Sequence, residues 1–125
     1  MAPSGGRVPE GFTVLSRLAS EFAAEIKHHD WSDAHIRADR AGHARGMDSH
    51  HAEAGDPLTP EQTNRVRVNV MWVTAQVLGH RDPNFDVVEF AKECGVSGFS
   101  QATLHSGLRR EKGVYAAPGT WNLGG

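Results

Sequence analysis

The sequence predicts a mainly α-helical fold: a small helical domain with a helix-turn-helix-like pair near the C-terminus and a short extended or wing-like tail. Two observations carry this prediction. The chain has 125 residues, which is enough for a single domain and too few for two independent cores. Apolar side chains recur at helical spacing in several segments, and residues that cap helices stand where those segments begin.

Two helices are predicted in the first half of the chain, from Phe12 to His29 and from Asp33 to Arg45. The apolar side chains of the first helix form a stripe that we expect to face the core, namely Phe12, Leu15, Leu18, Phe22 and Ile26. The second helix has Ile36 as its only large apolar side chain, which predicts shallow packing. Residues 1–11 and 46–58 are polar, contain glycine and proline and lack periodicity, so we expect a flexible N-terminus and a long loop.

The third predicted helix has the clearest boundaries. Thr59 is placed as the N-cap, Pro60 takes the first helical position, Gln62 can complete a capping box, and Gly79 predicts the end. We expect its buried face to be a stripe of valines widened by three other apolar residues: Val66, Val70, Val73 and Val77, with Met71, Ala75 and Leu78. The alternation over residues 65–70 also fits a strand, but capping and length favour a helix.

Two short helices are predicted in the last third. Residues 86–94 form the first, because Asp86 can cap it, Glu89 can complete a capping box, Phe85 can pack on Phe90 as a hydrophobic staple, and Gly95 ends it. The second starts after Ser100, with Phe99 able to pack on Leu104, and is expected to reach about Lys112 before Gly113 stops it. Residues 113–125 are aromatic and β-branched with a Pro-Gly turn, which predicts an extended arm or a small wing.

The segment Asp82-Pro83-Asn84-Phe85-Asp86, followed by Phe90, Cys94 and Gly95, resembles a segment of short uncharacterised proteins of actinobacterial bacteriophages. Their pattern is Asn-Pro-x-Phe-Asp-x-x-x-Phe-x-x-x-Cys-Gly, so the order of proline and asparagine differs here. The resemblance covers about residues 66–96. It implies a small accessory protein of phage or mobile-element origin, and it implies no activity or site residues.

Charge and composition exclude several classes of function. A formal net charge of -2 argues against general attraction to nucleic acid or anionic membranes, so any contact with a polyanion must be local. No apolar run approaches the roughly 20 residues needed to cross a bilayer, and we expect a cytoplasmic protein with no membrane partner. Cys94 is the only cysteine, which excludes an internal disulfide and suggests a small buried side chain.

The C-terminal helix pair leads to a first hypothesis, DNA binding. The last helix would present to DNA Gln101, Thr103, His105, Arg109 and Arg110. Glutamine and arginine can make bidentate contacts with adenine and guanine, and the tail would act as a wing. Residues 80–125 carry as many acidic as basic side chains, so an ordinary helical hairpin is the alternative. A homodimer would strengthen the DNA hypothesis, because small DNA-binding domains commonly pair to cover two half-sites.

The middle of the chain leads to a second hypothesis, a metal site. His35, Asp39 and His43 are spaced four apart, which would place them on one face of the predicted second helix as possible zinc ligands. Histidines on a solvated helix beside Asp39 need no metal, so no cofactor is assigned. Neither a glutamate placed as general base nor a nucleophile or phosphate-binding motif is present, so we expect a protein that is not an enzyme.

Aromatic residues lead to a third hypothesis, a protein-interaction or structural module. Tyr115 and Trp121 lie outside the strong apolar stripes, and exposed aromatic side chains are favoured anchors at interfaces. In the alternative interpretation, Trp121 folds back over the region of Met71 and Trp72 and closes the core.

Overall fold

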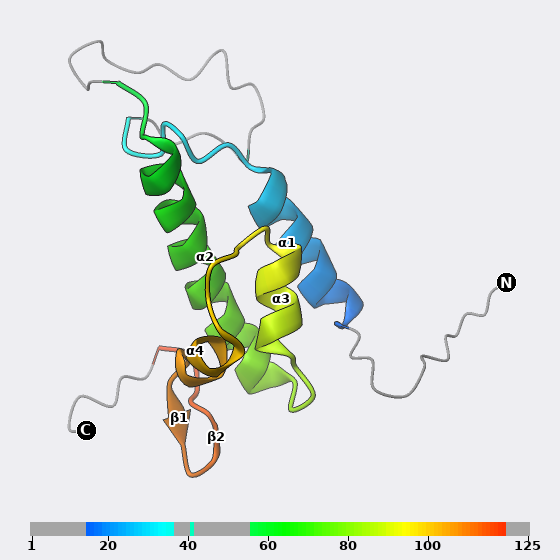
Figure 1. Ribbon diagram of the computed structural model, residues 1–125. Coiled ribbons are helices and arrows are strands. Elements are labelled where there is room, and N and C mark those ends of the chain that lie inside the picture. The colour runs from blue at the N-terminus through cyan, green and yellow to red at the C-terminus, as the bar shows by residue number, and fades with distance from the viewer. Residues whose placement is uncertain (1–14, 37–40, 42–55, 120–125) are drawn as a thin grey trace, which may run out of the picture.

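The computed structural model describes residues 15–36, 41 and 56–119. Four helices and one hairpin follow in chain order: α1 Arg17–His28, α2 Pro60–Arg81, α3 Val87–Glu93, α4 Gln101–Ser106, β1 Arg110–Glu111 and β2 Val114–Tyr115. Helices α1, α2 and α3 pack on one another, α4 packs on α3, and the hairpin packs on the end of α2 (Figure 1). The predicted mainly helical fold is confirmed.

Helix α1 begins later than predicted, and of the predicted apolar stripe Leu15 and Ile26 are buried. Ser16 is the N-cap, its hydroxyl accepting a hydrogen bond from the backbone N–H of Ala19 at 3.1 Å, while the predicted start at Phe12 lies outside the described residues. The buried side chains of the helix are Ala19, Ala23 and Ile26, with Leu15 just before the cap. Two predicted core residues are exposed, Leu18 by 57% and Phe22 by 44%. Two of these four side chains are alanine methyl groups, which allow α1 to pack closely on α2 and α3.

The second predicted helix does not form over the part that can be followed. Residues 32–36 are turns, closed by hydrogen bonds from Ala34 N–H to Trp31 O and from Ile36 N–H to Asp33 O. Apart from Ala41, the remainder of that prediction lies outside the described residues, as do the predicted flexible residues 1–11 and most of the predicted loop 46–58.

Helix α2 starts as predicted and ends later. The capping box is present, with Gln62 N–H donating to the Thr59 hydroxyl at 3.1 Å and Thr59 N–H donating to the Gln62 side-chain oxygen at 2.9 Å. The helix continues through Gly79 to Arg81, so the predicted end at Gly79 was wrong. A Cβ at Gly79 would lie 2.7 Å from the Tyr115 ring, which explains the glycine by close packing instead of by helix termination.

The buried face of α2 matches the prediction only in part, at Met71, Ala75 and Leu78. Val68, Met71, Ala75 and Leu78 are buried, whereas Val73 is 71% exposed and Val77 is 41% exposed; Val66 and Val70 are only half-buried. The valines do form one stripe at helical spacing, but α1 and α3 cover the other side of the helix. Helix α2 therefore carries apolar side chains on two faces and buries one of them fully.

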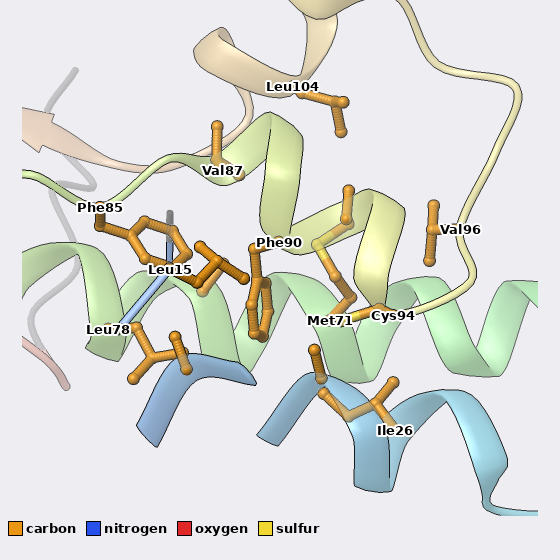
Figure 2. Packing of buried hydrophobic residues seen from close by; sticks show 14 of the residues in the cluster. Leu15, Ile26, Met71, Leu78, Phe85, Val87, Phe90, Cys94, Val96 and Leu104 are labelled. Atoms are coloured by element: carbon orange, nitrogen blue, oxygen red, sulfur yellow. The ribbon is translucent and has the colours of Figure 1, made fainter. Parts of the chain in front are cut away.

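Helix α3 provides the centre of the core. Asp86 accepts hydrogen bonds from the N–H groups of Val88 and Glu89, and the Phe85 and Phe90 rings lie 5.3 Å apart as the predicted staple. At its end Gly95 has φ +83°, and a hydrogen bond from Val96 N–H to Ala91 O completes a Schellman motif. Figure 2 shows side chains of α1, α2 and α3 converging around Phe90.

Helix α4 is shorter than predicted, and a hairpin follows it. The helix ends at Ser106, and β1 pairs with β2 so that Glu111 faces Val114 and Arg110 faces Tyr115. The two turn residues, Lys112 and Gly113, have φ +55° and +84°, as a type I′ turn requires. A wing-like hairpin is thus present over residues 110–115 and overlaps the predicted tail 113–125 only in part, and the helical prediction as far as Lys112 was wrong.

The connection between α3 and α4, residues 94–100, is longer than the three or four residues of a DNA-binding helix-turn-helix. The Phe99 ring lies 6.3 Å from that of Trp72 on α2, edge to face.

Candidate functional site

The outer surface of α4 holds three of the five predicted DNA contacts. Ser100 caps the helix, its hydroxyl accepting a hydrogen bond from Thr103 N–H, and Leu104 is the helix's buried anchor. Gln101, Thr103 and His105 are exposed. Gln101 and His105 are four residues apart and so share one face of the helix, whereas Thr103 projects from another side.

Arg110 lies on the hairpin beside this helix. Its guanidinium stacks over the Tyr115 ring at 4.3 Å from the ring centroid, and its Nη2 donates to the Tyr115 hydroxyl at 3.1 Å and to the His105 carbonyl at 3.2 Å. These contacts hold an exposed cation at the C-terminal end of α4. Arg109 and Arg110, which were predicted to lie on the last helix, both follow it.

A buried glutamine fixes the base of the hairpin. Gln76 of α2 is 5% exposed, and its side-chain oxygen accepts a hydrogen bond from Arg109 N–H at 2.8 Å. Its Nε2 donates to Arg109 O at 3.1 Å and to Ala116 O at 3.0 Å. The amide side chain thus satisfies backbone groups from both arms of the hairpin, and Arg109 itself is half-buried.

Tyr115, a predicted interaction residue, packs against the core. Its ring packs on Gly79, and its carbonyl oxygen lies 3.1 Å from Nδ1 of His80. The residue is half-buried against the core, and the stacked Arg110 lies on it. The other predicted interaction residue, Trp121, lies outside the described residues.

Charge is separated between the two helices of the C-terminal pair. Residues 100–119 carry three basic side chains, Arg109, Arg110 and Lys112, and one acidic side chain, Glu111. Helix α3 and its cap carry instead Asp86, Glu89 and Glu93 with Lys92. Burial, then a hydrogen bond with Glu93, raises the pKa of Glu89. Residues 80–125 carry equal numbers of acidic and basic side chains, but the segment of α4 and the hairpin carries more basic ones.

An apolar groove of about 350 Å³ lies between α2 and the chain on either side of the hairpin. Its walls are Trp72, Val73, Gln76, Val77, Gly107, Leu108, Arg109, Pro118 and Gly119. Trp72 is packed so closely on Gly107 that a Cβ there would come within 2.4 Å of the indole. The groove thus runs along the exposed valine face of α2.

Only one of the three predicted metal ligands lies in the part of the chain that the structure describes. His35 lies in the turn after α1, where its Nε2 is 2.9 Å from the carbonyl oxygen of Asp56, while Asp39 and His43 lie outside the described residues. Within residues 15–36, 41 and 56–119, no three histidine, cysteine or acidic side chains are grouped to hold a metal ion.

Cys94 is fully buried, as expected. Burial, with a smaller contribution from the negative charge of Glu93, raises the pKa of its thiol to about 12. A thiol with that pKa stays protonated at neutral pH and is a poor nucleophile.

Sequence reasoning missed Gln76 and the hairpin turn. A two-residue Lys-Gly turn followed by Val and Tyr was a usable signal for the hairpin, because type I′ turns favour glycine at a position with positive φ. Gln76 offered no local signal, since its partners are 33 and 40 residues away.

Comparison with protein-family models, curated proteins and solved structures finds no match to this chain. Among the described helices, none combines the length and the apolar character that a membrane span requires.

Proposed function

We propose that this protein is a non-enzymatic accessory or regulatory protein of a phage or mobile element, which acts in the cytoplasm and binds DNA through α4 and the hairpin. The single observation that carries the proposal is the exposed α4 face with Gln101 and His105, flanked by the fixed guanidinium of Arg110. With a helix followed by a two-stranded hairpin, the helix can enter a DNA groove while the hairpin contacts the sugar-phosphate backbone.

The residues divide into two roles in this proposal. Gln101 can make a bidentate contact with adenine, and His105 and Thr103 can donate to base edges or phosphates. Arg110 and Lys112 contact phosphates, because both are exposed and lie on the hairpin and not on the helix. Arg109 is half-buried and lines the groove behind, so its role is smaller.

The expected salt dependence follows from the number of phosphate contacts. Two contacts give a slope of about -1.8 in a plot of log affinity against log salt concentration, so affinity falls about 60-fold over a tenfold rise in salt. This is a modest dependence, in keeping with a surface that has few cations.

A titration by fluorescence anisotropy with mixed-sequence duplex DNA, repeated from 20 to 200 mM salt as a rough range, tests the proposal. Lys112→Asn keeps the turn and removes one charge, so it should reduce the slope by about one. Arg17→Ala removes the same charge from the exposed surface of α1 and should leave binding unchanged. Absence of binding at low salt, or equal losses in both variants, would reject the proposal.

A second candidate, protein interaction, is favoured by a separate observation. Leu18 and Phe22 are both exposed and adjacent on α1, flanked by the ion pair of Arg17 with Glu21. A face with both signs of charge can pair with a second copy of itself without net repulsion, which would give a homodimer. Light scattering across a concentration series should then show a dimer that Phe22→Glu dissociates and Val114→Glu, on the exposed hairpin, does not.

A further inference from the structure

Arg110 and Tyr115 face each other across the hairpin and are direct partners in the register of β1 and β2. Ala116 N–H donates to Arg109 O at 2.9 Å, so those two residues form a hydrogen-bonded pair. The next pair along the hairpin, Arg110 with Tyr115, is then of the non-hydrogen-bonded kind, in which the side chains lie closer together. The guanidinium and the ring therefore meet on one face of the hairpin.

The carboxylate next to Arg110 in the sequence belongs to the other face. Successive side chains of a strand point to opposite sides, so Glu111 shares its face with Val114, its partner in the register. Among the described residues, the contacts of the Arg110 guanidinium are with the Tyr115 ring and hydroxyl and with the His105 carbonyl. Its positive charge is thus held there by dipoles and by an aromatic ring.

These contacts leave hydrogen-bond donors for an anion. Nη2 of Arg110 uses its two hydrogens, one on the Tyr115 hydroxyl at 3.1 Å and one on the His105 carbonyl at 3.2 Å, so the Nε hydrogen and the two Nη1 hydrogens are left. The Tyr115 hydroxyl accepts from the guanidinium and keeps its own proton to donate. Because a hydroxyl that accepts from a cation is polarised by it, this proton is the stronger donor.

The arrangement of these donors favours a phosphate over a carboxylate. Both edges of a guanidinium that pair with a planar carboxylate include Nη2, whose hydrogens are already used in Arg110. A tetrahedral phosphate has oxygens in several directions and can accept from the guanidinium and from the Tyr115 O–H together. The guanidinium is also fixed before binding, so little further rotamer entropy is lost when an anion binds.

We propose that Arg110 and Tyr115 form a binding site for one phosphate group. The guanidinium supplies the charge, and Tyr115 both fixes the guanidinium and donates its hydroxyl proton to the anion. The expected source of the phosphate is the DNA backbone, and in this respect the site rests on the proposed function. A small molecule that carries a phosphate has the same chemistry, and the two sources differ in the response to duplex DNA.

NMR of the full-length chain with ¹⁵N-labelled arginine tests the site. The Arg110 Nε–H signal should shift and saturate with inorganic phosphate, and should not saturate with sodium chloride at equal ionic strength. Tyr115→Phe keeps the ring that packs on Gly79 and removes the hydroxyl, so it should weaken phosphate binding about tenfold. The control is Arg65→Gln, an exposed position near the start of α2, which should leave the Arg110 titration unchanged.

Duplex DNA of mixed sequence then identifies the source of the phosphate. If the DNA backbone occupies the site, the duplex shifts the Arg110 signal at concentrations well below those of inorganic phosphate, and Tyr115→Phe reduces this effect. If inorganic phosphate binds and the duplex leaves the Arg110 signal unmoved, the site is confirmed for a small phosphate-bearing ligand and DNA binding by the hairpin is rejected.

Two results would overturn the site itself. Signals of Arg110 and Arg65 that shift alike with phosphate, without saturation, would show charge screening and no bound anion. Phosphate binding by Tyr115→Phe as tight as that of the wild type would show that the Tyr115 hydroxyl takes no part in it.

Discussion

The side-chain amide of Gln76 pairs with both backbone polar groups of Arg109, accepting from its N–H at 2.8 Å and donating to its carbonyl at 3.1 Å. The Gln76 side chain thereby makes the pair of backbone hydrogen bonds with Arg109 that an adjacent strand would make. Because Nε2 also donates to Ala116 O, a single side chain joins α2 to the segments before β1 and after β2.

Gln76→Leu should destabilise the protein by about 2–5 kcal/mol, because Arg109 N–H and Ala116 O would be buried without partners and each such group costs about 1–3 kcal/mol. Urea denaturation followed by circular dichroism measures the change. Asn69→Leu, an exposed polar residue on the same helix, is the control and should change stability by less than about 0.5 kcal/mol. Equal effects of the two substitutions would contradict the role assigned to Gln76.

Gly79→Ala should destabilise the protein by about 1–3 kcal/mol although alanine is the better helix former by about 1 kcal/mol, because the new methyl group meets the Tyr115 ring. In a Tyr115→Ala background the same substitution should become stabilising. Thermal melts of the four proteins in this cycle give the coupling energy. Additive effects of the two substitutions on stability would mean that the Tyr115 ring does not restrict the side chain at position 79.

Gly113→Ala should cost about 1–2 kcal/mol, since its φ of +84° is unfavourable for any residue with a Cβ. Lys112→Asn should be neutral or slightly stabilising, because asparagine tolerates the φ of +55° better than lysine. Melting temperatures of the two variants provide the check. If Lys112→Asn proves as damaging as Gly113→Ala, the turn is not of type I′.

Cys94 should react with a disulfide reagent such as dithiobis(nitrobenzoate) only when the protein unfolds, because the thiol is buried and its pKa is raised to about 12. The unfolded thiol ionises near its ordinary value of 9.0, whereas the folded thiol keeps its proton to higher pH. The contribution to stability is therefore complete below pH 9 and is lost as the pH rises from 9 towards 12. Cys94→Ala should lack this part of the pH dependence in denaturation curves, and rapid labelling of the folded protein would contradict the burial.

Local signals in the sequence predicted the starts of α2, α3 and α4. Thr59, Asp86 and Ser100 all cap helices, because a cap is made by atoms within three residues of each other. The ends were harder to predict. Gly95 terminates α3 as expected, but Gly79 does not terminate α2, since its role depends on Tyr115 from a distant part of the chain.

Periodicity predicted which residues share a face but identified only some of the buried ones. Val73 and Val77 are larger than Ala75, yet Ala75 is the one that lies in the core. Likewise, Ala19 and Ala23 are buried while Leu18 and Phe22 are exposed. Close helix contacts select small side chains, and the choice depends on partners that a single helix cannot reveal. The sequence predicted that Gln101, Thr103 and His105 lie on a short helix. It did not predict that Arg110 lies on a hairpin, because the hairpin is held by Gln76, a residue distant in the chain.

The attachment of the hairpin through so few side chains also has a dynamic consequence. The hairpin contacts the other elements mainly through Gln76, Gly79 and His80 near the end of α2. A hydrogen bond from Arg110 to the His105 carbonyl joins it to α4. Regions with few buried apolar contacts open at a lower free energy than the global transition, so the amide protons of β1 and β2 should exchange with solvent while those around Phe90 remain protected. The hairpin would then detach from the helices and return to them while α1, α2 and α3 stay folded.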